Sequence, residues 1–352
     1  MGQPADRILT APRALDDAVD FELPDREHRL GRVLLYQEVA RPRVGPPFEL
    51  NGSAWRLRFP RPRADRLEYL LEIDGRMTTD PTNPLRAPGP FGDKSVVEWP
   101  EYEPPRWLDT AAPNGTVEPV DVRCRRLGAT VRVLLYATSE RPPPGAPLLV
   151  VHDGPEYAQY SQLMRFLDAM VSEARIPPLW AALVPPVDRN QTYSASARYA
   201  HALAHELLPA LRSRARHGPR IGMGASLGAL AMLHGQLRHP ESFDGLLLQS
   251  GSFFRQRWDR VESSFVRYRR ITRFVGTVLR GSGEPAPAPI PVVVTCGAAE
   301  ENLANNRAVA AALVRQGYPV TLGEVADAHN WVCWRDAFDP YLPDLIRAVT
   351  RC

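Results

Sequence analysis

Residues 224–228 read Gly-Ala-Ser-Leu-Gly and match the pattern G-x-S-x-G. In this pattern a serine lies at a sharp turn between a strand and a helix, and its hydroxyl is exposed above the edge of a sheet. Ile221 and Met223 precede the turn, as on the end of a short strand. The apolar residues after the turn have near-helical spacing: Leu227, Leu230, Met232 and Leu233. The segment therefore predicts a strand–turn–helix unit that presents Ser226.

The length and charge of the chain limit what it can be. A chain of 352 residues is long for a single core, so we expect two domains. Its apolar fraction of 44% and charged fraction of 24% are those of an ordinary globular protein. A net charge of +3 gives no support for nucleic-acid binding. No segment approaches the roughly 18 apolar residues of a membrane helix, so we expect no membrane partner.

The amino terminus and the cysteines bear on location. Residues 1–20 mix charges and prolines and contain no apolar run of signal-peptide length. Four cysteines show neither a C-x-x-C pair nor metal-ligand spacing: Cys124, Cys296, Cys333 and Cys352. Free thiols are typical of a reducing compartment. We expect a cytoplasmic protein that holds no metal, and the sequence makes no prediction about its oligomeric state.

The first third of the chain is β-like. Residues 1–25 are expected to form a flexible arm. Short strands are predicted within residues 26–105, at 33–36, 55–59, 69–73 and 95–99, and Asp74-Gly75 is a strong turn signal. This pattern predicts a β-sandwich. Residues 103–119 are rich in proline and turn formers, and residues 106–118 within them are expected to be a linker.

From residue 119 to 352, continuous apolar strands alternate with helical segments. The strands are predicted at 131–136, 148–151, 179–184, 245–248, 291–294 and 320–325, and the helices at 161–174, 194–212 and 302–315. Such alternation is typical of a buried, mostly parallel sheet covered by helices. Pro209 predicts a kink or break in the second helix. The fold class is therefore α/β, with a separate β domain in front.

Two later strands end close to ionisable residues. Glu300 and Glu301 follow the strand that ends near residue 295, and His329 follows the strand at 320–325. Open α/β sheets place their sites beyond the carboxyl ends of strands. A serine hydroxyl needs a base such as imidazole, and a carboxylate orients that imidazole. We predict His329 as the base and Glu300, or alternatively Glu301, as the acid, while Asp327 is expected to be a turn former.

Such a serine also needs two converging N–H donors for the oxyanion. Leu227, directly after Ser226, supplies one. The second is expected from residues 152–157, the loop after the strand at 148–151. This chemistry requires neither a metal nor an organic cofactor.

Four blocks resemble the enterochelin (siderophore) esterases of the putative-esterase superfamily, which also holds feruloyl and acetylxylan esterases and mycolyltransferases. The blocks are Val-His-Asp-Gly at 151–154, Glu-Leu-Leu-Pro at 206–209, residues 224–228 with Gln-Ser-Gly-Ser at 249–252, and 329–335. The resemblance covers about 119–352. It implies an α/β-hydrolase domain in which Ser226 and His329 act together, with Glu300 at the acid position. Residues 69–97 are similar to an early-set immunoglobulin-like module.

The chain departs from this superfamily at two positions. In mycolyltransferase-like relatives the residue after Asp-Gly donates the second oxyanion N–H, but Pro155 has no N–H to donate. Gly154 or Glu156 is therefore expected to take this role. Thr192 stands where the family often carries glutamate, so a substrate contact there is expected to differ.

Residues 253–280 are rich in arginine and follow the strand next to the serine turn: Arg255, Arg257, Arg260, Arg267, Arg269, Arg270, Arg273 and Arg280. One interpretation is a basic rim that attracts an anionic substrate such as a ferric catecholate complex. The other is a solvated helix face in a chain whose single lysine is Lys94. Five residues are predicted to contact substrate: Tyr157, Arg189, Trp331, Arg267 and Arg270.

The sequence thus predicts a serine esterase acting on a small-molecule ester, first of all a siderophore-type lactone. A carbohydrate esterase releasing feruloyl or acetyl groups is an alternative, for which Trp55 and Trp99 would be sugar-stacking platforms. An acyltransferase is another. From a different class, a catalytically weak ligand-binding protein stays open because of Pro155.

Overall fold

The computed structural model describes the chain except for residues 1–10, 112–114, 282, 284–285, 287 and 351–352. Its contacts divide the chain into two compact units. Unit 1 holds the described residues up to Glu103 together with two segments from later in the chain, Gly297–Glu301 and Ala326–Asn330. Unit 2 holds the remaining residues from Pro104 onward.

Unit 1 contains two sheets. One has the order β1 (Arg13–Ala14), β2 (Ala18–Pro24), β6 (Ala54–Pro60) and β5 (Glu49–Asn51). The other has the order β4 (Val44–Pro47), β3 (Val33–Gln37), β7 (Arg66–Ile73), β10 (Lys94–Glu98) and β9 (Arg86–Ala87), with β8 (Arg76–Thr78) paired to β7. A single apolar cluster takes Val19 and Phe21 from the first sheet and Leu35 and Leu71 from the second.

The expected flexible arm over residues 1–25 is wrong for the part that the structure describes. Residues 13–14 and 18–24 are strands, and β2 pairs with β6 along its whole length. Alternation of Val19, Phe21 and Leu23 with polar residues explains this, because one face of β2 is buried in the core. Residues 1–10 lie outside the described residues.

The segment predicted as a linker, residues 106–118, is structured at both ends. A short 3-10 helix, η1 (Arg106–Asp109), buries Trp107 against Phe166 with the ring centroids 5.2 Å apart. The strand β11 (Thr116–Cys124) begins before residue 118. The turn formers around it concealed Trp107, a large apolar side chain that anchors this segment. Residues 112–114 lie outside the described part.

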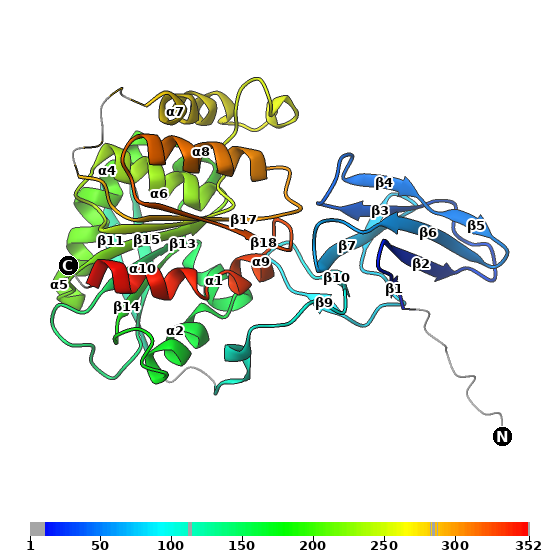
Figure 1. Ribbon diagram of the computed structural model, residues 1–352, viewed down its shortest axis with the longest axis horizontal. Helices are drawn as coiled ribbons and strands as arrows, with labels where there is room; N and C mark the ends of the chain where they lie inside the picture. Colours follow the sequence, from blue (N-terminus) through cyan, green and yellow to red (C-terminus); the bar gives the residue numbers. More distant parts are fainter. Residues whose placement is uncertain (1–10, 112–114, 282, 284–285, 287, 351–352) are drawn as a thin grey trace. The chain divides into compact units, whose positions relative to one another are not determined.

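Unit 2 is built on an eight-stranded sheet, as predicted mostly parallel (Figure 1). The order is β11, β12 (Ala129–Ala137), β14 (Trp180–Val184), β13 (Leu148–His152), β15 (Arg220–Ala225), β16 (Gly245–Gln249), β17 (Val292–Gly297) and β18 (Val320–Val325). β12 pairs antiparallel with both β11 and β14. Along the order β14, β13, β15, β16 and β17, each strand pairs in parallel with the next. The carboxyl ends of β13, β15, β16 and β17 therefore meet at one edge, where α/β sheets carry their sites.

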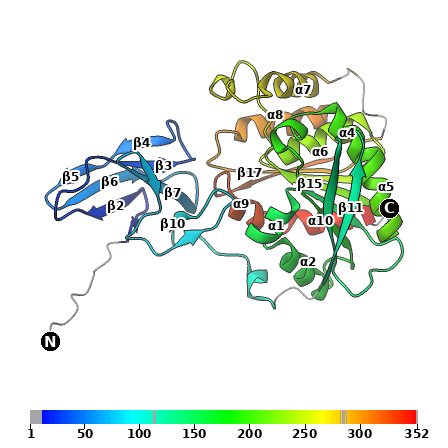
Figure 2. The same ribbon diagram turned by 180° about the vertical axis from the view of Figure 1, so that it is seen from behind.

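Helices cover both faces of this sheet (Figures 1 and 2). One face carries α4 (Ala197–Ala202), α5 (Leu208–Ala215), α6 (Leu227–Arg238), α7 (Tyr268–Arg280) and α8 (Leu303–Arg315). The other carries α1 (Gly154–Tyr160), α2 (Leu163–Ser172), α9 (Trp331–Asp336) and α10 (Tyr341–Thr350). No helix among the described residues combines the length and the apolarity needed to cross a bilayer.

The expected break near Pro209 is confirmed. A π-helical segment, η2 (Leu203–Leu207), separates α4 from α5 directly before Leu208 and Pro209. Proline cannot donate the backbone hydrogen bond that a continuous helix needs, so the turn before it widens. Cys124, Cys296 and Cys333 are buried and form no disulfide, and Cys352 lies outside the described residues.

Candidate active site

Ser226 occupies the turn that its sequence motif predicts. β15 ends at Ala225, α6 begins at Leu227, and Ser226 between them has φ 54° and ψ −119°. A non-glycine residue in this region is strained, and the surroundings must hold it there. They do so through two backbone hydrogen bonds: Ser226 N–H donates to Gln249 O (2.9 Å), and Ser252 N–H donates to Ser226 O (3.0 Å). Ser226 is half-buried in a stretch, 221–230, whose other residues are buried.

Both motif glycines are required by close packing. A Cβ on Gly224 would lie 2.6 Å from the carbonyl carbon of Gly228. A Cβ on Gly228 would lie 3.2 Å from both the His152 Cβ and an Asp153 carboxylate oxygen. The first glycine lets α6 turn back tightly, and the second lets α6 approach the end of β13.

The Ser226 hydroxyl lies next to the Ser252 hydroxyl, a contact that its sequence motif does not predict. Its Oγ lies 3.0 Å from the Oγ of Ser252. Next to this pair, the Gln249 side chain accepts a hydrogen bond from Tyr157 (2.8 Å) and donates one to the Trp334 carbonyl (2.9 Å). These buried contacts hold residues 249–252 against Ser226. The family resemblance included this block but did not predict that it supports Ser226.

Residues 154–157 were expected to be a loop, but they are the first turn of α1. The helix begins directly after Asp153, which has a left-handed backbone (φ 51°). A Cβ on Gly154 would lie 2.3 Å from the Leu183 Cα, so only glycine fits. The first backbone N–H groups of a helix have no partner within the helix, and proline is tolerated there. Pro155 therefore leaves the N–H groups of Gly154 and Glu156 on either side of it.

His152 joins the two helix starts. Its Nδ1–H donates to the Gly228 carbonyl (3.0 Å), and its Nε2 accepts from the Tyr199 hydroxyl (2.7 Å). Burial lowers the pKa of His152 to about 4, so the ring is neutral at physiological pH. Both nitrogens of this neutral ring are used in hydrogen bonds. His152 therefore has a structural role, linking the end of β13 to the start of α6.

The Asp153 carboxylate is held by an arginine from the α3 segment. Arg189, at the start of α3 (Arg189–Thr192), donates from Nε and Nη2 to the two Asp153 oxygens at 2.9 and 2.8 Å. This bidentate ion pair fixes the residue that precedes Gly154. Two of the three guanidinium nitrogens of Arg189, predicted to bind substrate, are thus engaged by Asp153.

Glu300 and His329 lie together in unit 1. The His329 Nδ1 is 2.8 Å from Glu300 Oε2, and the other oxygen of Glu300 accepts the Gly297 N–H at 2.8 Å. The Glu300 side chain is 1% exposed and that of His329 is 35% exposed. With the Nδ1 proton directed at the carboxylate, Nε2 is the basic nitrogen of the ring.

Glu301, the alternative acid, has other partners. Its carboxylate binds Arg41 at 2.6 Å and Arg43 at 3.5 Å. The two neighbouring glutamates therefore differ in environment: Glu300 is buried on the imidazole, whereas Glu301 is part of a half-exposed ion-pair cluster. The sequence alone gave no basis for this difference.

Asp327, expected to be a turn former, is a buried anchor of the His329 loop. Its Oδ1 accepts from the Ala328 N–H (2.7 Å) and the Asn330 amide (2.8 Å), and its Oδ2 accepts from Arg66 (3.0 Å). Arg66 lies on β7 and is 3% exposed. A separation of 261 residues hid this pair from sequence reasoning.

The same contact gives a stability prediction. In Asp327→Asn the shape is kept but the buried Arg66 guanidinium loses a carboxylate, which typically costs about 3 kcal/mol or more. We expect guanidinium chloride unfolding to show this loss. Glu324→Gln, which breaks the exposed Arg307–Glu324 pair, is the control and should leave stability almost unchanged. Equal effects of the two substitutions would contradict the anchoring role.

Three other predicted substrate contacts are tied into the protein. Tyr157 is fully buried and its hydroxyl donates to Gln249, while its contact with substrate stays a prediction. Arg267 donates to the Gln191 side chain at 2.6 Å, and Arg270 donates to the carbonyls of Gln191 and Ser194. Both arginines therefore hold α7 to the α3 segment.

Trp331 is a further predicted contact, and it lies among aromatic side chains. Its ring meets Tyr157 and Trp334 edge-on, with centroids 5.3 and 4.7 Å apart. Tyr160 lies at 5.7 Å on another side. Its contact with substrate stays a prediction.

Several known proteins are similar to this chain. Residues 125–345 match the Putative esterase family. The iron(III) enterobactin esterase of Escherichia coli O6:H1 is 26% identical over 302 residues, which are 82% of this chain and 72% of that protein. The corresponding enzyme of Dickeya dadantii is 28% identical over 276 residues, 72% of this chain and 62% of that one.

A crystal structure of an enterobactin esterase from Shigella flexneri, determined in the presence of enterobactin, covers 96% of both chains with a TM-score of 0.76 and 21% identity. This likeness shows that the fold is of the α/β-hydrolase type. The family match covers well over half of the chain. The chain therefore belongs to the Putative esterase family and is an ester-hydrolysing enzyme.

Proposed function

We propose that Ser226, His329 and Glu300 form a catalytic triad that hydrolyses the ester bonds of a siderophore-type lactone. One observation carries the triad: a buried Glu300 carboxylate 2.8 Å from Nδ1 of a half-exposed His329. The strained turn at Ser226 supports the nucleophile. The substrate class rests on the relatives named as iron(III) enterobactin esterases.

The reaction proceeds in two balanced halves. His329 Nε2 takes the proton of the Ser226 hydroxyl as Oγ attacks the ester carbonyl carbon. The tetrahedral intermediate collapses, the C–O bond breaks, and the imidazolium gives its proton to the leaving alkoxide. His329 then deprotonates a water that attacks the acyl-enzyme, and the proton returns to Ser226 Oγ as the acid product leaves. Glu300 stabilises the imidazolium in both halves.

The oxyanion is assigned to two helix starts. Leu227 N–H opens α6, and the N–H groups of Gly154 and Glu156 lie in the first turn of α1. The His152–Gly228 hydrogen bond joins these starts. With Gly154 or Glu156 as the second donor, Pro155 is no obstacle to catalysis, so the weak binding-protein alternative loses its main argument.

The amino-terminal unit is inferred to be an immunoglobulin-like sandwich, because two antiparallel sheets share one apolar core. Among its described residues, the two tryptophans expected to stack on sugars have other contacts. Trp99 is 2% exposed and its indole N–H donates to the Leu15 carbonyl at 2.8 Å. Trp55 donates to Asp25 at 3.1 Å. Trp99 is therefore a core residue, and Trp55 is held at the core's edge.

The arginine-rich segment is proposed to attract an anionic ester. A groove of about 600 Å³ is lined by exposed arginines at positions 257, 269, 273 and 280, beside Trp258. A cluster of one charge sign raises the local concentration of an oppositely charged substrate.

Charge reversal in this segment tests the attraction. Reversing Arg267, Arg269 and Arg270 to glutamate should raise KM for an anionic catecholate ester by about 10-fold or more, and hardly change KM for a neutral ester. Because Arg267 and Arg270 also hold α7, the pair Arg269→Glu with Arg273→Glu is the cleaner variant. Equal KM changes for both esters would overturn the role.

Comparing two substrates tests the proposed function. We expect the purified enzyme to hydrolyse a catecholate trilactone at a kcat/KM at least about 100-fold above that for a feruloyl sugar ester, because its polar contacts would fit the first and not the second. Liquid chromatography of the acid and alcohol products gives both rates. A higher kcat/KM for the feruloyl ester would replace the siderophore proposal with the carbohydrate-esterase alternative.

A further inference from the structure

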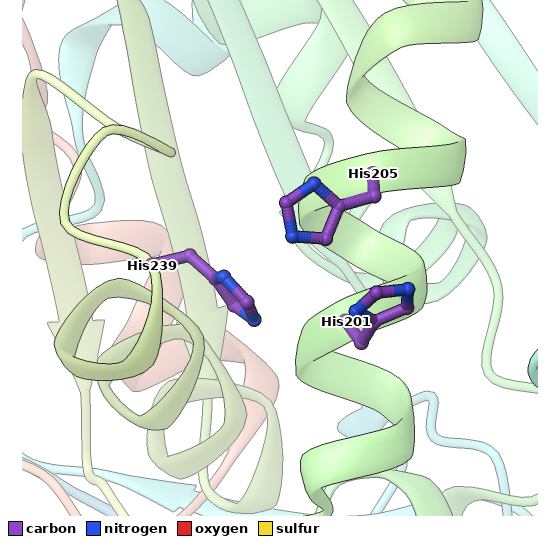
Figure 3. Close-up of side chains that lie close together, drawn as sticks. All are labelled: His201, His205 and His239. Atoms are coloured by element: carbon purple, nitrogen blue, oxygen red, sulfur yellow. The ribbon is translucent and has the colours of Figure 1, made fainter.

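Three histidines away from Ser226 converge from two helical segments of unit 2. His201 lies on α4, His205 lies one turn later in η2, and His239 directly follows α6. One ring nitrogen of each lies within 4.8 Å of the others. The His205 ring centroid is 4.5 Å from that of His201 and 4.7 Å from that of His239. Figure 3 shows His205 and His239 facing each other across the space between the two segments.

The backbone of the two helical segments sets the positions of these three rings. His201 and His205 are four residues apart, a spacing that puts both on one side of a helix. The His239 N–H donates to the Gly235 carbonyl at 2.9 Å, which fixes the end of α6. Gly235 also lets α6 pack closely on η2, because a Cβ there would lie 3.3 Å from Leu203 Cδ2. Irregular π-turns of this kind are frequent at functional sites.

The donor set selects the class of ligand. Imidazole nitrogens suit zinc, copper, nickel and cobalt, whereas calcium and magnesium need oxygen ligands. Zinc sites with three protein ligands keep a fourth position for water. Two nitrogens on one tetrahedral zinc lie about 3.3 Å apart, so the present spacing of up to 4.8 Å closes by small side-chain rotations.

The cluster is accessible and has no other evident purpose. His205 is exposed, and His201 and His239 are half-exposed, so an ion can enter from solvent. Within the described part of the chain, none of the six ring nitrogens takes part in a hydrogen bond. Each neutral imidazole has one nitrogen lone pair available, so the three rings together can bind a cation.

We propose that His201, His205 and His239 bind one divalent transition-metal ion of the zinc class, with water completing the coordination. The ion would join α4 and η2 to the carboxyl end of α6, the helix whose amino end follows Ser226. It is a structural clamp on this helix pair and takes no part in the ester chemistry. The spacing of the cysteines predicted no metal, although the spacing of His201 and His205 was a signal for one.

Titration of the full-length, metal-free enzyme tests the site. Isothermal titration with Zn²⁺ at pH 7.5 should give one equivalent per chain, and Co²⁺ should give the visible absorption of a four- or five-coordinate ion. Zinc at about 100-fold above its Kd should raise Tm by roughly 5 °C, since it binds the folded state alone. Ester hydrolysis by the metal-free enzyme should persist, whichever ester it prefers.

Variants identify the ligands. His205→Ala removes an exposed side chain and should abolish the equivalent, and His239→Gln should do the same. His205→Cys should restore Co²⁺ binding with an added thiolate charge-transfer band, which only a direct ligand produces. His28→Ala, at an exposed histidine of unit 1, is the control and should keep full binding.

Three results would overturn the site. The first is that His205→Ala still binds one zinc per chain. The second is that His329→Ala loses zinc binding while the variants of the three histidines keep it. The third is that zinc leaves Tm unchanged. The first two would assign the metal to other groups, including the Glu300–His329 pair. None of these results depends on whether Ser226 is the nucleophile.

Discussion

Ser226→Ala should lower kcat for ester hydrolysis by about 10⁴- to 10⁶-fold, because it removes the hydroxyl that forms the acyl-enzyme. Residual rate would come from the oxyanion donors and substrate binding alone. Alanine removes one oxygen at a half-buried position, so the fold and Tm should be unchanged within a few degrees. Steady-state assays with a chromogenic ester, extended to long times, measure the loss.

Ser213→Ala is the matched control, since this serine is exposed on α5 and lies outside the motif at 224–228. It should leave kcat within about twofold of the parent, as expected for a surface substitution. A Ser226→Ala enzyme with more than about one-tenth of the parent kcat would remove Ser226 from the mechanism.

Glu300→Gln should lower kcat by about 10⁴-fold. A glutamine amide can donate to Nδ1, which would move the ring proton to Nε2 and remove the base. It also takes away the charge that stabilises the imidazolium. KM should change little, because Glu300 is buried and contacts the ring rather than the substrate. Measuring kcat and KM separately shows whether the effect is on chemistry.

The neighbouring Glu301→Gln is the control for this substitution. Glu301 pairs with Arg41 and Arg43 instead of His329, so its kcat should stay within about threefold of the parent. If Glu301→Gln is the slower enzyme, Glu301 is the acid and the role of Glu300 is structural.

Local patterns predicted the parts of this protein whose signals are local. The strand and helix around Ser226, the Asp74-Gly75 turn, where both residues have positive φ, and the break before Pro209 all follow from neighbouring residues. Chain order placed Glu300 and His329 after their strands. Their contact with each other could not be predicted without the folded structure. The same holds for the different environments of Glu300 and Glu301.

What the sequence missed depends on contacts between distant segments. Arg66 and Asp327 are 261 residues apart, so no periodicity links them. Tyr157 looked like a loop residue beside the oxyanion site, but α1 begins earlier than expected and turns its ring into the core. Strand β2 was hidden because its charged and proline-rich surroundings resembled an arm, although Val19, Phe21 and Leu23 alternate.

Active-site labelling tests the central claim most directly. A fluorophosphonate should form one covalent adduct per chain, and peptide mass spectrometry should place it on Ser226 within the tryptic or chymotryptic peptide. The Ser226→Ala variant should not be labelled, and prior incubation with a catecholate trilactone should slow labelling of the parent. An adduct at another serine, or no adduct on a folded protein, would contradict the assignment of Ser226 as the nucleophile.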